Sequence, residues 1–230
     1  FNPEGEMFTY DADMEWDVGQ PWYRPTRVNH IISGGEYGWR WGTGKWPDYY
    51  ADSLPSTLDT GLGSPTAMIF GTESNFPDRF KNALYIADWQ NGRILLVDLI
   101  PVGASYTCQY EVFLEGGPLN VCDMQFGPDG ALYFITGGRG SQSGLYRVTP
   151  TAKQKTKSTA PVINEKTEAL ALTARKLRRQ IEQYQTKPVA DINLLWPHLS
   201  SEDRWLRFAA GRAIENQDVS QWRTKALEES

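Results

Sequence analysis

The sequence has only two cysteines and two histidines among its 230 residues, and it has no long apolar run. No Cys-x-x-Cys-His motif is present, so we expect no c-type haem on this chain. No stretch approaches the roughly 18 consecutive apolar residues of a membrane span. The first ten residues lack the basic and apolar regions of a secretion leader, and the chain does not begin with Met. We therefore expect the chain to be part of a longer or processed protein.

Charge is distributed unevenly along the chain. Residues 1–150 carry 9 Lys+Arg against 18 Asp+Glu, a net charge of −9, whereas residues 151–230 carry 14 against 10, a net charge of +4. Two such compositions indicate two domains, 1–150 and 163–230. The stretch from Pro150 to Pro161 has no large apolar residue to bury, which predicts a linker over 151–162.

The first part contains a repeat that indicates β-hairpins. Phe1-Asn-Pro-Glu-Gly5 and Phe126-Gly-Pro-Asp-Gly130 share the pattern Phe-x-Pro-acid-Gly, and β-prone residues follow each copy. Proline and glycine at these positions favour a tight turn. A third copy with an insertion precedes Ala83, which lies 48 residues before Ala131, close to the ~40 to 50 residues of a four-stranded propeller blade. We therefore predict a partial β-propeller of about three four-stranded antiparallel blades over 1–150.

The second part has the periodicity of helices. Apolar residues recur every three or four positions over 168–185, which predicts a helix that ends before Lys187-Pro188. A short helix follows around Leu195, Asp203 and the residues before it form a capping box, and Asp218 caps a last helix. Four short helices with small alanine faces predict an α-helical HEAT-like segment. Arg175, Arg178 and Arg179 are interpreted as a solvated helix face, and with an acidic total charge we expect no nucleic-acid partner.

Several motifs resemble one family of proteins. They are Phe1-Asn-Pro-Glu-Gly5, Thr26-Arg-Val-Asn-His30 and Gly34-Gly-Glu-Tyr-Gly-Trp39. They resemble the glucose/sorbosone dehydrogenase-like propellers, whose members include soluble quinoproteins that use pyrroloquinoline quinone and calcium. The chain is most similar to large bacterial proteins described as membrane-bound dehydrogenases, in which such a propeller precedes HEAT-like helices and often a haem c domain. The resemblance implies a periplasmic or secreted protein, with the remaining blades upstream or on another chain.

The same resemblance shows which catalytic parts are absent. The family's catalytic His would precede Phe1, and its cofactor-binding cations fall here on Gln90, Asn120 and Cys122. An anionic tricarboxylate quinone needs cations to offset the desolvation of its charges. These neutral residues therefore argue against binding of pyrroloquinoline quinone.

Four alternating carboxylates are the candidate metal ligands. Asp11, Asp13, Glu15 and Asp17 would share one face of an extended segment, and oxygen-only ligands favour Ca²⁺ over Zn²⁺. The resemblance implies a calcium loop at about this place. The alternative is a solvated acidic loop between blades.

Three basic residues are the candidate ligand-binding residues. Arg27 and His30 could line the axial mouth of a propeller, and Arg139 lies in a glycine-rich loop that could face a ligand or only join two strands. Each could instead have a purely structural role. Cys108 and Cys122 could form a disulfide across paired strands or remain free thiols.

These observations favour part of an extracytoplasmic sugar or alcohol dehydrogenase-like protein that is not catalytically complete by itself. The alternative is a non-catalytic module, propeller plus HEAT repeats, that binds a protein partner or a glycan.

Overall fold

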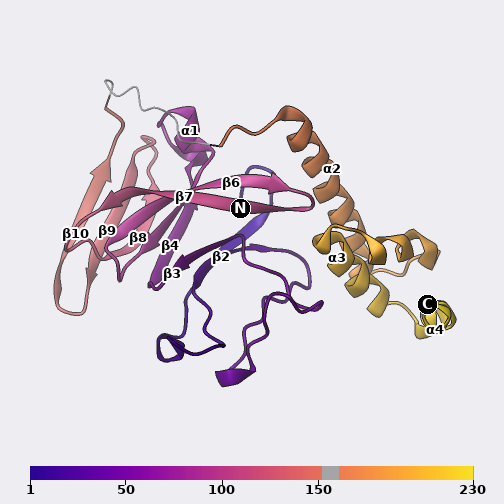
Figure 1. Ribbon diagram of the computed structural model, residues 1–230. Helices are drawn as coiled ribbons and strands as arrows, with labels where there is room; N and C mark the ends of the chain where they lie inside the picture. Colours follow the sequence, from indigo (N-terminus) through magenta and orange to yellow (C-terminus); the bar gives the residue numbers. More distant parts are fainter. Residues whose placement is uncertain (152–160, 230) are drawn as a thin grey trace.

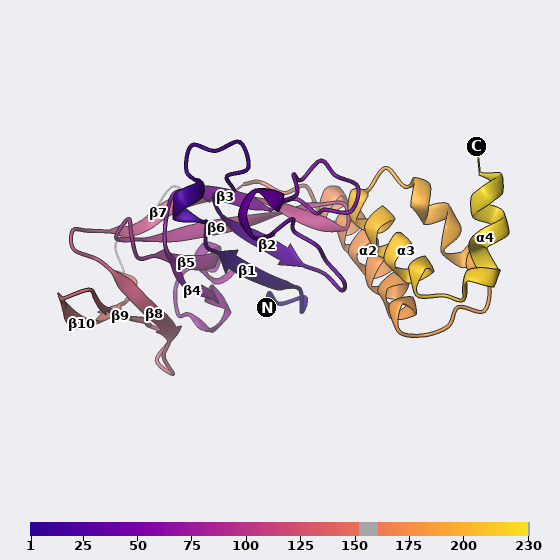
Figure 2. The same ribbon diagram turned by 90° about the horizontal axis from the view of Figure 1, so that it is seen from below.

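The computed structural model describes residues 1–151 and 161–229, and residues 152–160 of the predicted linker lie outside them. The first part forms three antiparallel sheets that stack face to face. The helices follow at the far end of the molecule (Figures 1 and 2). The strands are β1 (Met7–Asp11), β2 (Thr26–Ile31), β3 (Leu58–Gly61), β4 (Pro65–Phe70), β5 (Leu84–Asp88), β6 (Arg93–Val102), β7 (Ser105–Glu115), β8 (Val121–Phe126), β9 (Leu132–Gly138) and β10 (Ser141–Val148).

The middle sheet, in the order β4-β5-β6-β7, packs on both of its faces. Side chains alternate between the two faces of a strand. Along β5, Tyr85 and Ala87 join one core with residues of β8 and β9, whereas Leu84 and Ile86 join a second core with residues of β1 and β2. Every residue of β5 is buried. The stacking of sheets face to face is consistent with part of a propeller.

The predicted turns at Gly5 and Gly130 are confirmed, whereas the third copy forms the short helix α1 (Asp78–Lys81) in place of a tight turn. Gly5 and Gly130 have φ values of 81° and 71°, the left-handed region that glycine enters without strain. A Cβ at Gly130 would also lie 2.6 Å from the backbone nitrogen of Asn75. The strand count differs from the prediction, because among the described residues β1-β2-β3 and β8-β9-β10 have three strands each and the middle sheet has four.

The second part contains helices near the predicted places. They are α2 (Glu165–Glu182), α3 (Arg204–Glu215) and α4 (Val219–Glu228), with 3-10 turns η4 (Gln183–Gln185), η5 (Ile192–Leu194) and η6 (Trp196–Ser200) between α2 and α3. The side chains of Asp203 and Asp218 accept hydrogen bonds from backbone amides in the first turns of α3 and α4. The cap at Asp218 is as predicted, whereas Asp203 is itself the N-cap of α3 and not the last residue of a capping box. Within the described residues, no helix is long and apolar enough to cross a membrane.

Most of the apolar stripe that periodicity predicts is buried or partly buried, because Ala174, Leu177, Ile181 and Tyr184 pack in the core that α2 shares with α3. Leu170, at the start of the expected apolar stripe, is 63% exposed, whereas Arg175 and Arg178 are 0% and 1% exposed. The interpretation of these arginines as a solvated face is therefore wrong. The reason is that α2 lies against carboxylates of the first few residues, which pair with its arginines.

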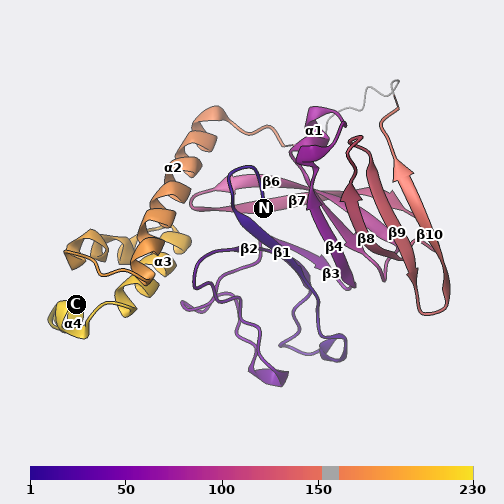
Figure 3. The ribbon, with the colours of Figure 1, turned by 180° about the vertical axis from the view of Figure 1, so that it is seen from behind.

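Glu6 is the centre of this contact. Its Oε2 accepts hydrogen bonds from Nη2 of Arg178 at 2.6 Å and Nε2 of His30 at 2.9 Å, and its Oε1 accepts one from Arg179. Glu4 binds Arg175 through two parallel hydrogen bonds of 2.8 and 2.9 Å. Such bidentate pairs are among the stronger hydrogen bonds in proteins. These bonds fix the helical segment to the N-terminal residues that lead into the first sheet. Figure 3 shows α2 and the first sheet from behind.

The tip of the β6–β7 hairpin makes a second contact with the helices. Asp203 accepts from the backbone N–H of Trp205 through Oδ1 and from that of Ala104 through Oδ2, at 2.9 and 2.6 Å. A Cβ at Gly103 would lie 2.2 Å from the same carboxylate, so glycine is required there. Around this contact, apolar residues of both parts share one core; from the first part these are Ile32, Leu54 and Ala104.

The buried cluster predicts that the protein loses stability in acid. Burial would raise the pKa of Glu6, but its bonds to His30 and Arg178 outweigh burial and lower that pKa to about 2, whereas burial lowers the pKa of His30. The unfolded chain therefore binds more protons at both residues, and stability falls first below pH 6.5 and then between pH 4.5 and about 2. Burial raises the pKa of Glu182, which offsets part of this effect. For Glu6 the loss is on the order of 3 kcal/mol.

Urea denaturation across this pH range at constant ionic strength measures the effect. The Glu6→Gln variant should lose the step below pH 4.5. An unfolding free energy that does not change with pH would contradict the prediction.

Removal of one partner from the buried Glu6 cluster should lower the free energy of unfolding. Arg178→Ala leaves the carboxylates of Glu6 and Glu182 buried with fewer partners, and we expect a loss of about 3–5 kcal/mol in urea denaturation. Arg147→Ala is the matched control, because Arg147 and its partner Asp129 are 51% and 39% exposed. We expect the control to cost under about 1 kcal/mol. Equal losses would show that the buried cluster does not hold the helices in place.

Candidate functional site

His30 lies on β2 beneath the helices and is fully buried. Its Nδ1 lies 2.8 Å from the hydroxyl oxygen of Ser105 and its Nε2 lies 2.9 Å from the carboxylate of Glu6. The rings of Phe8, Tyr106 and Trp205 surround it. A carboxylate on one side and a hydroxyl on the other fit a neutral imidazole that donates from Nε2 and accepts at Nδ1. Both nitrogens are thus engaged inside the protein, and the structure gives no geometric support to a ligand role for His30.

Arg27 lies three residues earlier on β2 and therefore on the opposite face of the strand. Its Nη2 donates to the carbonyl oxygen of Tyr37 at 2.9 Å. Burial lowers its pKa, and the charges of Asp11 and Asp59, which it faces across β1 and β3, act against that effect. Arg27 lines a cavity of about 120 Å³. This volume is below the 300–1,000 Å³ usual for small-molecule sites.

Arg139 lies in the exposed turn between β9 and β10, with φ of 50°. Its guanidinium carbon lies 5.3 Å from the ring centre of Trp89. The structure therefore does not bring Arg27, His30 and Arg139 together. Their binding role stays a prediction.

The four alternating carboxylates do not converge either. β1 ends at Asp11, and the chain turns through η1 (Glu15–Asp17) in place of a continued extended strand. Asp11 accepts from Asn29 at 2.6 Å, Asp13 accepts from the hydroxyl of Tyr23 at 2.7 Å, and Asp17 binds Lys45 at 2.5 Å. Among residues 1–151 and 161–229, no three His, Cys, Asp or Glu side chains form a metal-binding group. The residues present do not fit the predicted calcium site.

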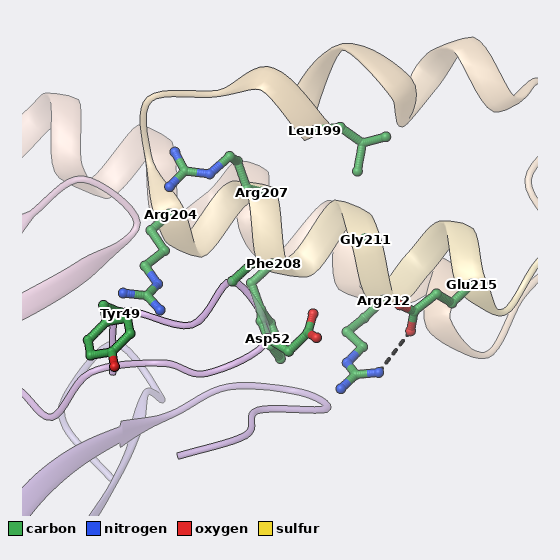
Figure 4. Close-up of a pocket in the computed structure, with 10 residues that line it drawn as sticks. Tyr49, Asp52, Leu199, Arg204, Arg207, Phe208, Gly211, Arg212 and Glu215 are labelled. Carbon is green, nitrogen blue, oxygen red and sulfur yellow. Dashed lines mark hydrogen bonds and ion pairs between the residues drawn. The ribbon is translucent and has the colours of Figure 1, made fainter. Parts of the chain in front are cut away.

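A cavity of about 430 Å³ lies between the loop around Tyr49 to Asp52 and one face of α3 (Figure 4). We call it the α3 cleft. Three arginines of α3 line it, Arg204, Arg207 and Arg212, together with the carboxylates of Asp52 and Glu215. The view shows Arg204 extending toward Tyr49 and Arg212 bound to Glu215. Its volume falls in the range of small-molecule sites.

Sequence reasoning missed this cleft. Its residues on α3 recur at intervals of three or four, from Arg204 through Phe208 and Arg212 to Glu215, and so share one helix face. That periodicity could have been found in the sequence. The loop that faces it, about 150 residues away along the chain, could not.

Comparison with solved structures shows what the fold resembles. A structure described as an oxidoreductase (glucose dehydrogenase) from Thermus thermophilus is 22% identical, with a TM-score of 0.50 over 64% of this chain and 43% of that one. A structure named glucose dehydrogenase is 18% identical, with a TM-score of 0.52 over 65% and 42%. The chain shares part of its fold with glucose dehydrogenases. It spans less than half the length of these two structures. No family model and no curated protein matches the chain.

The residues at the family's cofactor positions do not fit a quinone. Gln90 is exposed and neutral. The amide of Asn120 donates to the carbonyl oxygen of Trp89 at 2.8 Å, and the sulfur of Cys122 lies 3.3 Å from the carbonyl oxygen of Gly137. The neighbouring Arg93 is bound to Asp88. No cation at these three positions is placed to hold an anionic tricarboxylate.

Both cysteines are free thiols. Cys108 lies on β7 opposite Leu99 of β6, and Cys122 lies on β8 in a different sheet, so the two do not face each other across paired strands. Of the two alternatives, this excludes the disulfide and leaves the free thiols.

Cys108 should react slowly in the folded protein. Burial raises the pKa of its thiol to about 12, and the thiolate is the reactive form. In a Cys122→Ser variant near neutral pH, we expect iodoacetamide to alkylate Cys108 at least about a hundredfold more slowly in the native than in the unfolded chain. Mass spectrometry of timed samples measures both rates. Similar rates would contradict the burial of this thiol.

Proposed function

We propose that the chain supplies part of the propeller of a sugar or alcohol dehydrogenase-like protein, and that its role there is to carry the helical segment as a fixed extension. The single observation behind this proposal is the fold shared with glucose dehydrogenases. Because the chain spans less than half of those structures, the activity of the whole protein, its substrate and its remaining blades belong to the proposal. A HEAT-like continuation of the helices, a haem c partner and a periplasmic or secreted location are also part of the proposal.

A fixed, non-catalytic role is supported by the state of His30. Its two ring nitrogens are bound to Glu6 and Ser105, and Glu6 is also bound to two arginines of α2. A base that takes a proton from a substrate must be within hydrogen-bond reach of it. No other histidine is available in the first part of the chain, since His198 lies in the helical segment. We therefore propose that a catalytic histidine of the whole protein belongs to blades outside this chain.

A second candidate function is a non-catalytic module that binds a partner or a glycan. The neutral residues Gln90, Asn120 and Cys122 favour it, because they remove the cations that the quinone would need.

Dye-linked oxidation assays test the proposal. The chain alone, mixed with pyrroloquinoline quinone and Ca²⁺, should neither retain the quinone absorbance after desalting nor reduce dye with aldoses. The longest protein that contains the chain should reduce dye, and its His30→Gln variant should keep its kcat while its melting temperature falls. Quinone retention or dye reduction by the chain alone would overturn the fixed, non-catalytic role. No oxidation by the longer protein would leave the binding module as the function.

A further inference from the structure

Two of the three arginines of the α3 cleft, Arg204 and Arg207, are held in place by backbone carbonyl oxygens and not by carboxylates. Nη2 of Arg204 donates to the carbonyl oxygens of Tyr50 and Ser53, and Nη1 of Arg207 donates to those of Ser201 and Glu202. A carbonyl oxygen fixes a guanidinium but does not cancel its charge. Within the described residues, the remaining nitrogens of both arginines have no hydrogen-bond partner. They are thus oriented donors, and within the described residues neither guanidinium forms an ion pair, although the charge of Asp48 acts on Arg204.

The charges of these arginines act on one another. Burial lowers the pKa of Arg204, the charge of Asp48 opposes that effect, and the charge of Arg207 adds to it. Arg212 is the one member with a carboxylate partner, Glu215, at 2.8 Å. An anion in the cleft would relieve the repulsion and use the vacant donors.

Gly211 supplies a second, independent observation. It lies inside α3, where glycine costs about 1 kcal/mol relative to alanine. Elsewhere in the chain close contacts explain a glycine, as at Gly103, but a Cβ at Gly211 would meet no atom within 4 Å. Gly211 has no positive φ to explain it. Its missing side chain instead widens the cleft, because Gly211 is one of the lining residues.

The other lining groups indicate what kind of anion fits. Asp52 and Glu215 offer carboxylate oxygens that accept hydrogen bonds from hydroxyl groups. Tyr49, 77% exposed, presents its ring at the side of the cleft, as Figure 4 shows. Aromatic rings of this kind pack against flat apolar faces. Donors for a carboxylate, acceptors for hydroxyls and one ring are complementary to a sugar acid.

We propose that the α3 cleft binds a sugar acid, with its carboxylate on Arg204 and Arg207 and its hydroxyl groups toward Asp52 and Glu215. This proposal does not depend on the function proposed above.

Isothermal titration of the whole 230-residue chain with glucuronate at fixed ionic strength tests the proposal. Glucose is the control that lacks the carboxylate, and inorganic sulfate is the control that lacks the hydroxyl groups. Saturable binding of glucuronate that exceeds both controls is the expected result. Binding of sulfate alone, equal binding of glucose, or no binding of glucuronate would overturn the proposal.

Three variants test whether glucuronate binds in the α3 cleft or elsewhere on the protein. Arg207→Gln should weaken glucuronate binding about tenfold or more, because a hydrogen bond to a charged group is lost. Arg147→Gln removes a positive charge from β10, outside the cleft, and should leave binding unchanged. Gly211→Leu should fill the cleft and abolish binding while the melting temperature stays the same or rises. Binding that persists in Gly211→Leu would place the ligand elsewhere and overturn the proposal.

Discussion

The carboxylate of Glu6 is the constraint on which the arrangement of the two parts depends. It is almost fully buried, and it accepts hydrogen bonds from His30 of the first sheet and from Arg178 and Arg179 of the helical segment. A buried charge is tolerable only when it is paired, so the sheet residue and the helix residues each need the other. The apolar core shared by Ile32, Leu54 and the helices has no such directional requirement. Hydrophobic burial brings the parts together, and the Glu6 cluster fixes where α2 lies.

This constraint also limits what the first part can do chemically. A neutral His30 that donates to Glu6 stabilises the position of that carboxylate, and the same bond keeps His30 from a substrate. Loss of the helical segment would uncover His30, but it would also leave Glu6 without its arginines. The cohesion of the molecule and the burial of His30 thus have one cause.

Local patterns predicted the local structure well. The Pro-acid-Gly turns, the strands that follow them and the aspartate caps of α3 and α4 depend on residues close together in sequence, and the structure has them. Contacts between distant residues were predicted poorly. The apolar periodicity of α2 correctly marked Ile181 as buried, but Arg178 was interpreted as solvated. Arg178 is buried against Glu6, a partner 172 residues earlier in the chain. The alternating carboxylates predicted a metal site because their pattern contains no positive partner. The partner of Asp17 is Lys45, which lies 28 residues further along the chain. In each case a partner outside the local window decided the role of the charge.

The arginines of α2 and of α3 differ in their partners. This difference distinguishes arginines that join the two parts of the chain from arginines that could bind a ligand. Arg175, Arg178 and Arg179 bind carboxylates of the acidic first part, so the charge asymmetry that indicated two domains is also what joins them. Arg204 and Arg207 bind backbone carbonyl oxygens, which hold the guanidinium groups still but leave the charge. An arginine needed only for cohesion would be expected to follow the first pattern, since a carboxylate partner removes the cost of the charge. Arginines bound to carbonyl oxygens are better suited to an external anion. The adjacent Gly211, which no close contact requires, supports the same conclusion.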